Sequence, residues 1–328
     1  MKKIILLVVV LFSSAQIEAQ YRWRLLPTKM LYPVSGGQVV FDSTAANTKF
    51  YLLGGSSDSL QNPVDWIQEY DVVKNTWRIV GRMVQPRENF VADIWKNIVF
   101  SFGGTTDPLT DKYAVEAWDY KIVTNFSYVY DKRKDFGRTY STGHISGGNL
   151  YIIGGDPTNP GDTLAYIVAY NIDTKQVSFT FKFSSPNKDQ PRQHMTFIVD
   201  DNIYIFGGVT NGVMNTIQRF NIPSKKLDNL SPGNLLLEPR AGGAAVYNPI
   251  SKKGFIIGGY NERYKALNTV EEVSVLPDGT LQITRSAPLN IARTNPMVVN
   301  YRGTVAVFGG KDLNGYVVPE VEILENPT

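Results

Sequence analysis

Six glycine pairs recur at a nearly constant spacing, and this recurrence restricts the fold more than any other feature of the sequence. Each pair follows a short apolar run, such as YLLGG at 51–55 or YIIGG at 151–155. The pairs are Gly54-Gly55, Gly103-Gly104, Gly154-Gly155, Gly207-Gly208, Gly258-Gly259 and Gly309-Gly310, and their first glycines are 49, 51, 53, 51 and 51 residues apart. Such repeats are stacked structural units, because one unit cannot bury its apolar surface alone.

Other residues recur within the same units. An arginine precedes each of five pairs by 15 to 18 residues, namely Arg87, Arg138, Arg192, Arg240 and Arg293, and Val34 holds this place in the first unit. An aromatic residue followed by an acid or amide comes later in four units, at Tyr70-Asp71, Trp118-Asp119, Tyr170-Asn171 and Phe220-Asn221. The first copy closes with Asn75-Thr76-Trp77, whereas Val273 and Val321 lie near the aromatic position of the last two units.

These motifs resemble the kelch-repeat family over residues 21–328, with the period near 50 residues that this family has. The resemblance implies an all-β protein, a six-bladed β-propeller with four antiparallel strands in each blade. The kelch-repeat family shares this general fold with galactose oxidase-like propellers. Runs such as Leu150–Ile153 are apolar throughout, as expected for strands covered on both faces.

The glycine pairs, Tyr70, Trp77 and Trp23 are therefore expected to be structural. A glycine at a strand end lets one backbone approach another closely, and the aromatic rings would fill the space between blades. A phosphate-binding loop is disfavoured, because the pairs lack the GxxxxGK[ST] and GxGxxG contexts.

The N-terminal segment is expected to complete the last blade. Residues 317–324 supply a third strand to the sixth unit, and no fourth follows. The stretch YRWRLLP at 21–27 is similar to TWRIV at 76–80, the fourth strand of the first unit. Pairing of the two chain ends would close the ring and remove exposed strand edges.

The first 19 residues have the pattern of a secretory signal peptide. Lys2 and Lys3 precede an apolar run from Ile4 to Phe12, and Ala19 is a suitable cleavage position. The run has nine residues, whereas a membrane span needs about 20. We therefore expect one propeller over residues 20–328, without a membrane span and outside the cytoplasm: secreted, or periplasmic in a Gram-negative host. Asn125 and Asn229 begin N-x-S sequons and are candidate glycosylation sites in a secreted glycoprotein.

Composition narrows the possible partners. The chain has no cysteine, which removes thiol chemistry and disulfides. Its formal net charge of +3 comes without any long basic run, so nucleic acid binding is not expected. We expect a monomer without a metal or cofactor.

The recurring arginines are the main candidate ligand-binding residues. Five guanidinium groups at one mouth of the channel would suit carboxylates or phosphates, and the resemblance implies this use, since some kelch adaptors grip acidic peptides with arginines there. The alternative is structural, with each arginine bonded to loop carbonyls of its own blade. Residues two beyond each arginine could line the same mouth, and they are Asn89, Tyr140, His194, Gly242 and Asn295.

Enzymatic readings find less support. The copper site of galactose oxidase needs a cysteine cross-linked to tyrosine, and this chain has no cysteine and only His144 and His194, which occupy different places in their units. The sialidase signature SxDxGxTW is absent. A sialic-acid mutarotase-like isomerase is the remaining alternative, with Glu88 or Glu238 moving a proton. The favoured interpretation is a non-catalytic binding scaffold for a protein, glycan or acidic ligand.

Overall fold

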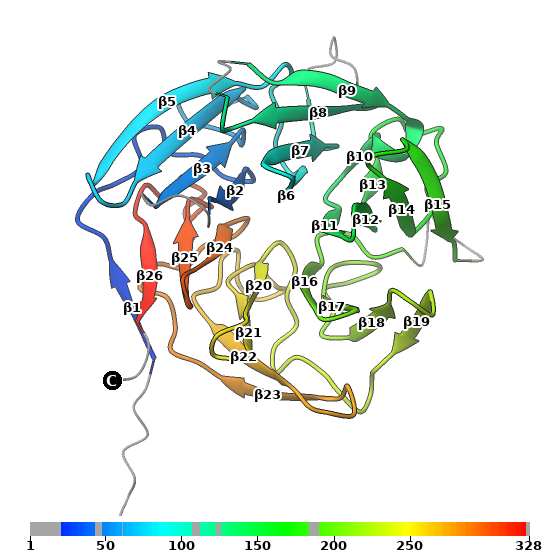
Figure 1. Cartoon of the computed structure of the whole chain (residues 1–328). Helices are drawn as coiled ribbons and strands as arrows, with labels where there is room; N and C mark the ends of the chain where they lie inside the picture. Colours follow the sequence, from blue (N-terminus) through cyan, green and yellow to red (C-terminus); the bar gives the residue numbers. More distant parts are fainter. Residues whose placement is uncertain are drawn as a thin grey trace, which may run out of the picture.

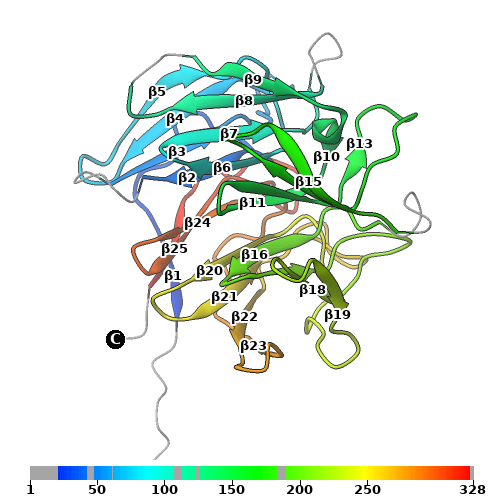
Figure 2. The same ribbon diagram turned by 45° about the vertical axis from the view of Figure 1, so that its right-hand side comes forward.

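Six four-stranded antiparallel sheets stand around a central channel like the blades of a propeller in the computed structural model (Figure 1). The structure describes residues 21–42, 48–60, 62–106, 112–122, 126–183 and 190–325. The expected signal peptide and Asn125 lie outside these residues. Seen from the turned view, the sheets are strongly twisted and their innermost strands surround the axis (Figure 2). The predicted six-bladed propeller is confirmed.

Blades 1 to 5 take their strands in chain order from the channel outward. Blade 1 consists of β2 (Gln38–Phe41), β3 (Lys49–Leu53), β4 (Trp66–Asp71) and β5 (Thr76–Arg82). Blade 2 consists of β6 (Val91–Trp95), β7 (Ile98–Phe102), β8 (Ala114–Asp119) and β9 (Tyr128–Lys132). Blade 3 consists of β11 (Thr142–Ser146), β12 (Asn149–Ile153), β14 (Ile167–Asn171) and β15 (Gln176–Phe181). A short 3-10 helix, η1 (Lys134–Phe136), precedes blade 3, and β10 (Arg138–Thr139) pairs with β13 (Asp156–Pro157) at its edge.

Blades 4 to 6 repeat the pattern. Blade 4 consists of β16 (Met195–Val199), β17 (Asn202–Phe206), β18 (Ile217–Asn221) and β19 (Lys226–Asn229). Blade 5 consists of β20 (Ala244–Asn248), β21 (Lys253–Ile257), β22 (Val270–Val275) and β23 (Leu281–Arg285). Blade 6 consists of β24 (Met297–Tyr301), β25 (Thr304–Phe308), β26 (Glu322–Glu325) and β1 (Arg22–Leu25). Blade 6 is thus built from both ends of the described chain.

The N-terminal strand closes the ring as predicted. β1 pairs antiparallel with β26, with Trp23 opposite Leu324, and the two strands lie side by side in Figure 1. The Trp23 ring is buried, and its Nε1–H donates to the Ala287 carbonyl at 2.9 Å. Trp23 also belongs to a buried apolar cluster that includes Phe255 of blade 5. The segment therefore contributes both a strand and part of the apolar contact between two blades.

Aromatic side chains fill the space between neighbouring blades. Tyr70 stacks on Trp77 with ring centroids 4.7 Å apart, and both belong to a buried cluster with Phe308 of blade 6. Val273 occupies the aromatic position of blade 5, as expected. In blade 6 that position belongs to Leu324 and not to Val321, because Val321 precedes it by three residues along the strand.

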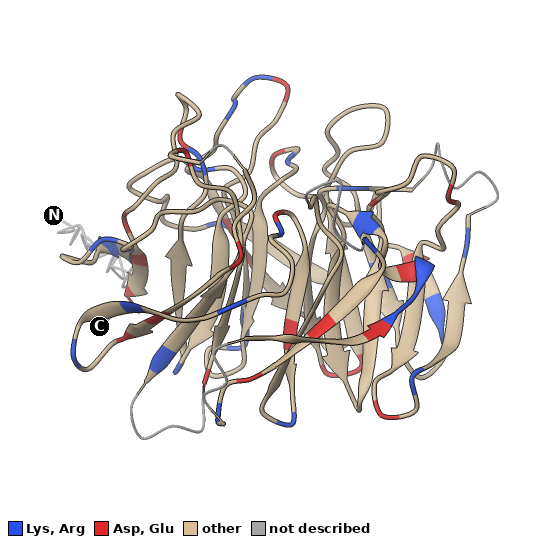
Figure 3. Cartoon of the chain, turned by 90° about the horizontal axis from the view of Figure 1, so that it is seen from above, with Lys and Arg blue, Asp and Glu red and all other residues tan. Residues whose placement is uncertain are grey.

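The glycine pairs have the structural role that the sequence predicts. Gly207 has φ +57°, and a Cβ added there would lie 2.3 Å from the Arg240 carbonyl oxygen of the next blade. The first glycine of every pair meets the next blade in the same way, so no side chain fits between the blades at these points. Lys and Arg positions are scattered among Asp and Glu positions in the view of Figure 3. The described residues contain no helix long and apolar enough to cross a membrane.

Candidate functional site

A closed ring of backbone hydrogen bonds surrounds one end of the channel. It joins six residues that lie two positions before the first residue of each innermost strand, which we call the rim residues: Gly36, Asn89, Tyr140, Gln193, Gly242 and Asn295. Each N–H donates to the carbonyl of the rim residue in the preceding blade, over distances of 2.6 to 3.1 Å. All six have φ between +48° and +67°. The ring therefore holds non-equivalent side chains on one rigid frame.

The rim corrects one sequence-based assignment. His194 does not belong to it, since Gln193 occupies the equivalent place in blade 4. The arginine position of that blade is likewise Pro191 and not Arg192, because the Pro191 carbonyl faces Gly154 just as the Arg240 carbonyl faces Gly207. In blade 4, Pro191 and Gln193 therefore hold the places that the recurring arginine had suggested for Arg192 and His194, one residue later in the chain. The other expected mouth residues, Asn89, Tyr140, Gly242 and Asn295, do lie on the rim.

Four of the five arginines do not face the channel mouth. Arg87, Arg138, Arg240 and Arg293 are 0 % exposed. Each donates to the carbonyl of the first glycine of its own blade, at 2.7 to 3.0 Å. Burial puts these guanidinium groups out of reach of a ligand, so the expected ring of five arginines at the mouth is wrong. The geometry instead fits the structural alternative for these four residues.

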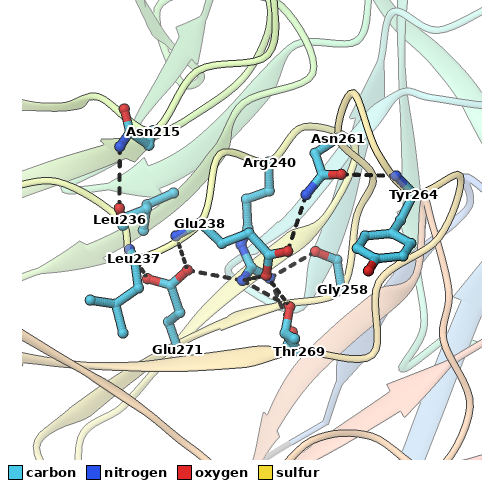
Figure 4. Close-up of polar contacts among 10 residues, drawn as sticks. All are labelled: Asn215, Leu236, Leu237, Glu238, Arg240, Gly258, Asn261, Tyr264, Thr269 and Glu271. Carbon is cyan, nitrogen blue, oxygen red and sulfur yellow. Dashed lines mark hydrogen bonds and ion pairs between the residues drawn. The ribbon is translucent and has the colours of Figure 1, made fainter.

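Blade 5 shows this buried arginine site in detail (Figure 4). Arg240 Nη1 donates to the carbonyls of Gly258 and Thr269, both at 3.0 Å, and Nη2 donates to Glu271 Oε1 at 2.9 Å. The other Glu271 oxygen accepts the Leu237 N–H, which ties the preceding loop to the strand. Glu238 also bonds Arg240 through Oε2.

A carboxylate accompanies the arginine in three blades. Glu116, Glu271 and Glu322 pair with Arg87, Arg240 and Arg293 at 3.0, 2.9 and 2.7 Å. Burial still lowers the pKa of Arg293, although Glu322 opposes the shift.

Arg138 differs, because Val168 takes the place of the carboxylate in blade 3. Its guanidinium is held by the backbone carbonyls of Asp135, Gly154 and Ala165, and burial lowers its pKa to about 10.

Two of the six residues that directly precede the rim residues are charged. Glu88 and Arg192 directly precede rim residues, and each pairs through its backbone with the residue after a glycine pair. Arg192 lies 3.4 Å from Asp156, and its side chain is 37 % exposed. Glu88 is half-buried, and burial raises its pKa against the opposing effects of Lys311 and Ser56. Both charge signs therefore meet at this mouth.

Two tyrosines add aromatic surface to the same mouth. Tyr140 is a rim residue whose pKa is raised by burial and by the nearby carboxylates of Glu88 and Asp156. The Tyr260 hydroxyl donates to Oε1 of the rim residue Gln193. A cavity of about 110 Å³ lies at the rim and is lined by Asn89, Tyr140, Gln193 and Asn295, among others. The mouth thus offers amide, phenol and charged groups within a small area.

Below the rim, the channel contains a cavity of about 360 Å³ with polar groups from blades 2 to 4. His144 Nε2 bonds the Thr196 hydroxyl at 2.8 Å, and His194 Nε2 bonds the Thr142 hydroxyl at 2.9 Å. Burial lowers the pKa of His144 to about 4 and that of His194 to about 3. The two imidazoles thus line the channel cavity from different positions in their blades, His144 within β11 and His194 just before β16.

The channel also holds the carboxyl group of Asp93. Its two oxygens accept the N–H groups of Ile94 and Ile145, each at 2.7 Å, and burial raises its pKa to about 6. The described residues contain no group of three or more acidic or imidazole side chains placed to hold a metal ion.

The remaining candidates lie away from the mouth or outside the described chain. Asn229 is exposed at the end of β19, and its use as a glycosylation site stays a prediction. Glu238 is bonded to Arg240, Thr269 and Asn261, so it is part of the structural network of blade 5.

Sequence reasoning missed Gln193, and it pointed to Asp156, Tyr260 and Lys311 only as parts of the variable segments that follow the glycine pairs. The glycine spacing could have located Gln193. Arg87, Arg138 and Arg293 precede the first glycine of their pair by 16 residues, and the residue at that distance in blade 4 is Pro191, two residues before Gln193. The other three directly follow the glycine pairs of blades 3, 5 and 6.

Comparison with known proteins places the chain among kelch propellers. Residues 150–314 match the family described as the Attractin/LZTR1 beta-propeller, and residues 41–84 match the kelch motif. A kelch repeat-containing protein of Dictyostelium discoideum is 25 % identical over 243 residues. That alignment covers 67 % of this chain and 35 % of the relative, so the chain spans about a third of that protein's length.

Proposed function

Since the chain belongs to the kelch-repeat β-propeller family, we propose that it is an exported, non-catalytic scaffold that binds a protein at the rim of its channel. Kelch propellers commonly bind proteins, and the binding residues of such folds lie on loops held by a rigid frame. The single observation that carries the proposal is the closed hydrogen-bonded rim, which presents Asn89, Tyr140, Gln193 and Asn295 together.

The charges at the mouth favour a partner segment of mixed polarity. Glu88 and Asp156 stand near Lys311 and Arg192, so an acidic polymer would meet repulsion as well as attraction. Tyrosine and amide side chains are suited to peptide backbone and side-chain contacts. We therefore favour a polypeptide loop carrying both a basic and an acidic group over a polyanion or an acidic glycan.

The test compares rim variants with a variant at the opposite end of the channel. The purified protein is screened against arrays of peptides and acidic glycans, and bound candidates are titrated by calorimetry. Tyr140→Ser and Arg192→Ala should each weaken binding at least tenfold. Lys96→Ala should not, because Lys96 lies at the far end of blade 2 and pairs with Asp173. Equal loss from Lys96→Ala, or exclusive binding of acidic glycans, would contradict the proposal.

Export is part of the proposal and rests on the N-terminal sequence. β1 begins at Arg22, so cleavage after Ala19 would leave the closing strand intact. N-terminal sequencing of the protein from the culture medium or periplasm should find Gln20 first.

A sugar isomerase remains the alternative because of Glu88. This carboxyl is half-buried at the mouth, and its raised pKa suits proton transfer. Exchange spectroscopy of sialic acid anomers would detect such activity, which Glu88→Gln should remove. Absence of any acceleration by the wild-type protein would exclude this alternative.

A further inference from the structure

Blade 4 lacks the buried arginine that four other blades possess, and a cavity lies in the same place. Arg87, Arg138, Arg240 and Arg293 each donate to the carbonyl of the first glycine of their blade. Each also donates to a carbonyl next to the start of the third strand, at 3.0 to 3.1 Å. Four copies of one contact set define the chemistry of this place: it accepts a planar, multiply donating cation.

The corresponding residues of blade 4 line a cavity of about 250 Å³. Pro191 holds the arginine position, Gly207 is the first glycine, Thr216 precedes the third strand, and Gln218 holds the position of the carboxylate. We call this cavity the blade 4 socket. Its wall also includes Asn211, which is exposed, and the half-buried Thr210 and Met214, so the socket reaches the surface beside loop 209–216.

Blade 1 also lacks the arginine, but Val34 and Gln68 are buried at the corresponding positions. Val34 is fully buried there. Gln68, the counterpart of Gln218, bonds both the N–H and the carbonyl of Tyr32, at 3.2 and 2.8 Å. In blade 4 the Gln218 Oε1 accepts the Tyr166 hydroxyl from blade 3 instead. Gln68 therefore provides a matched control position for Gln218.

We propose that the blade 4 socket binds a guanidinium group supplied from outside, namely an arginine side chain of the partner protein. The inference deepens the proposed function, since it rests on a protein partner and names one side chain of it. Arg138 shows that carbonyl groups alone can hold a guanidinium here, because its site contains Val168 where the other blades have glutamate. The planar fork of guanidinium matches diverging carbonyls better than the ammonium of lysine does.

The experiment titrates the full-length protein with N-acetyl-arginine amide, and with the lysine and citrulline analogues as controls. Saturable binding of the arginine compound is expected, with the citrulline analogue at least tenfold weaker because it lacks the charge. Gln218→Glu should lower the melting temperature of the free protein, tighten arginine binding at least tenfold and make arginine restore the melting temperature. Gln68→Glu should leave arginine binding unchanged.

A second variant fills the socket from within. Pro191→Arg combined with Gln218→Glu recreates the pair seen in blades 2, 5 and 6, and it should abolish binding of the arginine compound without lowering the melting temperature. Arginine binding that persists in this double variant would overturn the proposal. So would the absence of saturable binding to both wild type and Gln218→Glu at roughly 10 mM, a concentration that still detects interactions of about 3 kcal/mol. Tyr140→Ser and Arg192→Ala separate this proposal from the proposed function. If they abolish partner binding while either of these two contradicting results is found, the rim is still the binding site and only the proposal of an arginine socket is refuted.

Discussion

The buried arginines should differ in their contribution to stability according to whether a carboxylate accompanies them. Arg87→Met would leave Glu116 buried and charged without its guanidinium partner, although Val84, Gln85 and Ser127 would still donate to it. Loss of one member of a buried ion pair costs about 3–5 kcal/mol. Arg138→Met would leave no buried carboxylate unpaired, since Val168 stands at that position.

The cost of Arg138→Met follows from its three hydrogen bonds to backbone carbonyls. Each contributes about 0.5–1.5 kcal/mol net, and removal of a buried cation without a carboxylate partner offsets part of the loss. Among the described residues, the Nη2 atom of Arg138 has no hydrogen-bond partner. We therefore expect Arg138→Met to destabilise the protein by about 2 kcal/mol less than Arg87→Met.

Urea denaturation followed by tryptophan fluorescence measures this difference. Urea is preferable to guanidinium chloride, because guanidinium could occupy the blade 4 socket. The double variant Arg87→Met with Glu116→Met should recover most of the stability lost in Arg87→Met, as apolar replacement of a buried pair is often close to neutral. If Arg138→Met costs as much as Arg87→Met, or if the double variant recovers nothing, the reasoning from charge pairing is wrong.

Three further predictions concern closure, the glycine pairs and pH. Deletion of residues 20–27 should lower the melting temperature sharply, and Trp23→Ala alone should cost about 3–5 kcal/mol in urea titrations; an unchanged melting temperature of the truncated protein would refute closure by β1. Gly154→Ala, whose Cβ would lie 2.4 Å from His194 and 2.5 Å from the Pro191 oxygen, should destabilise far more than Gly147→Ala, which has a similar positive φ but open space around it; equal losses would show that backbone strain and not the close approach matters. Acidification from pH 6.5 to 4 should lower stability, because unfolding exposes His144 and His194 whose folded pKa values are about 4 and 3. Asp93 has the opposite effect on stability during acidification, because its folded pKa of about 6 lets the folded state bind a proton before the unfolded state does. Asp93→Asn should therefore make the loss of stability with falling pH steeper. A shallower dependence of stability on pH in this variant would contradict the prediction.

The repeat made the architecture predictable from sequence, but the position of individual side chains was less accessible. The glycine spacing fixed the number of blades, and the similarity of residues 21–27 to 76–80 located the closing strand. The predicted positions of Arg192 and His194 were wrong, because the arginine of blade 4 lies one residue after Pro191, which holds the position of the buried arginines in the other blades. A one-residue shift exchanges a buried position for one on the rim, and a recurring residue type alone cannot reveal it.

The sequence by itself determined that six similar units must cover one another and that both chain ends share a blade, because only those arrangements bury the repeated apolar runs. Only the tertiary structure decided which repeated residues face a ligand. The four arginines are enclosed because each guanidinium bonds two carbonyls from distant parts of the chain, 16 to 29 residues away. The rim and the blade 4 socket likewise arise from contacts among residues that no local pattern connects.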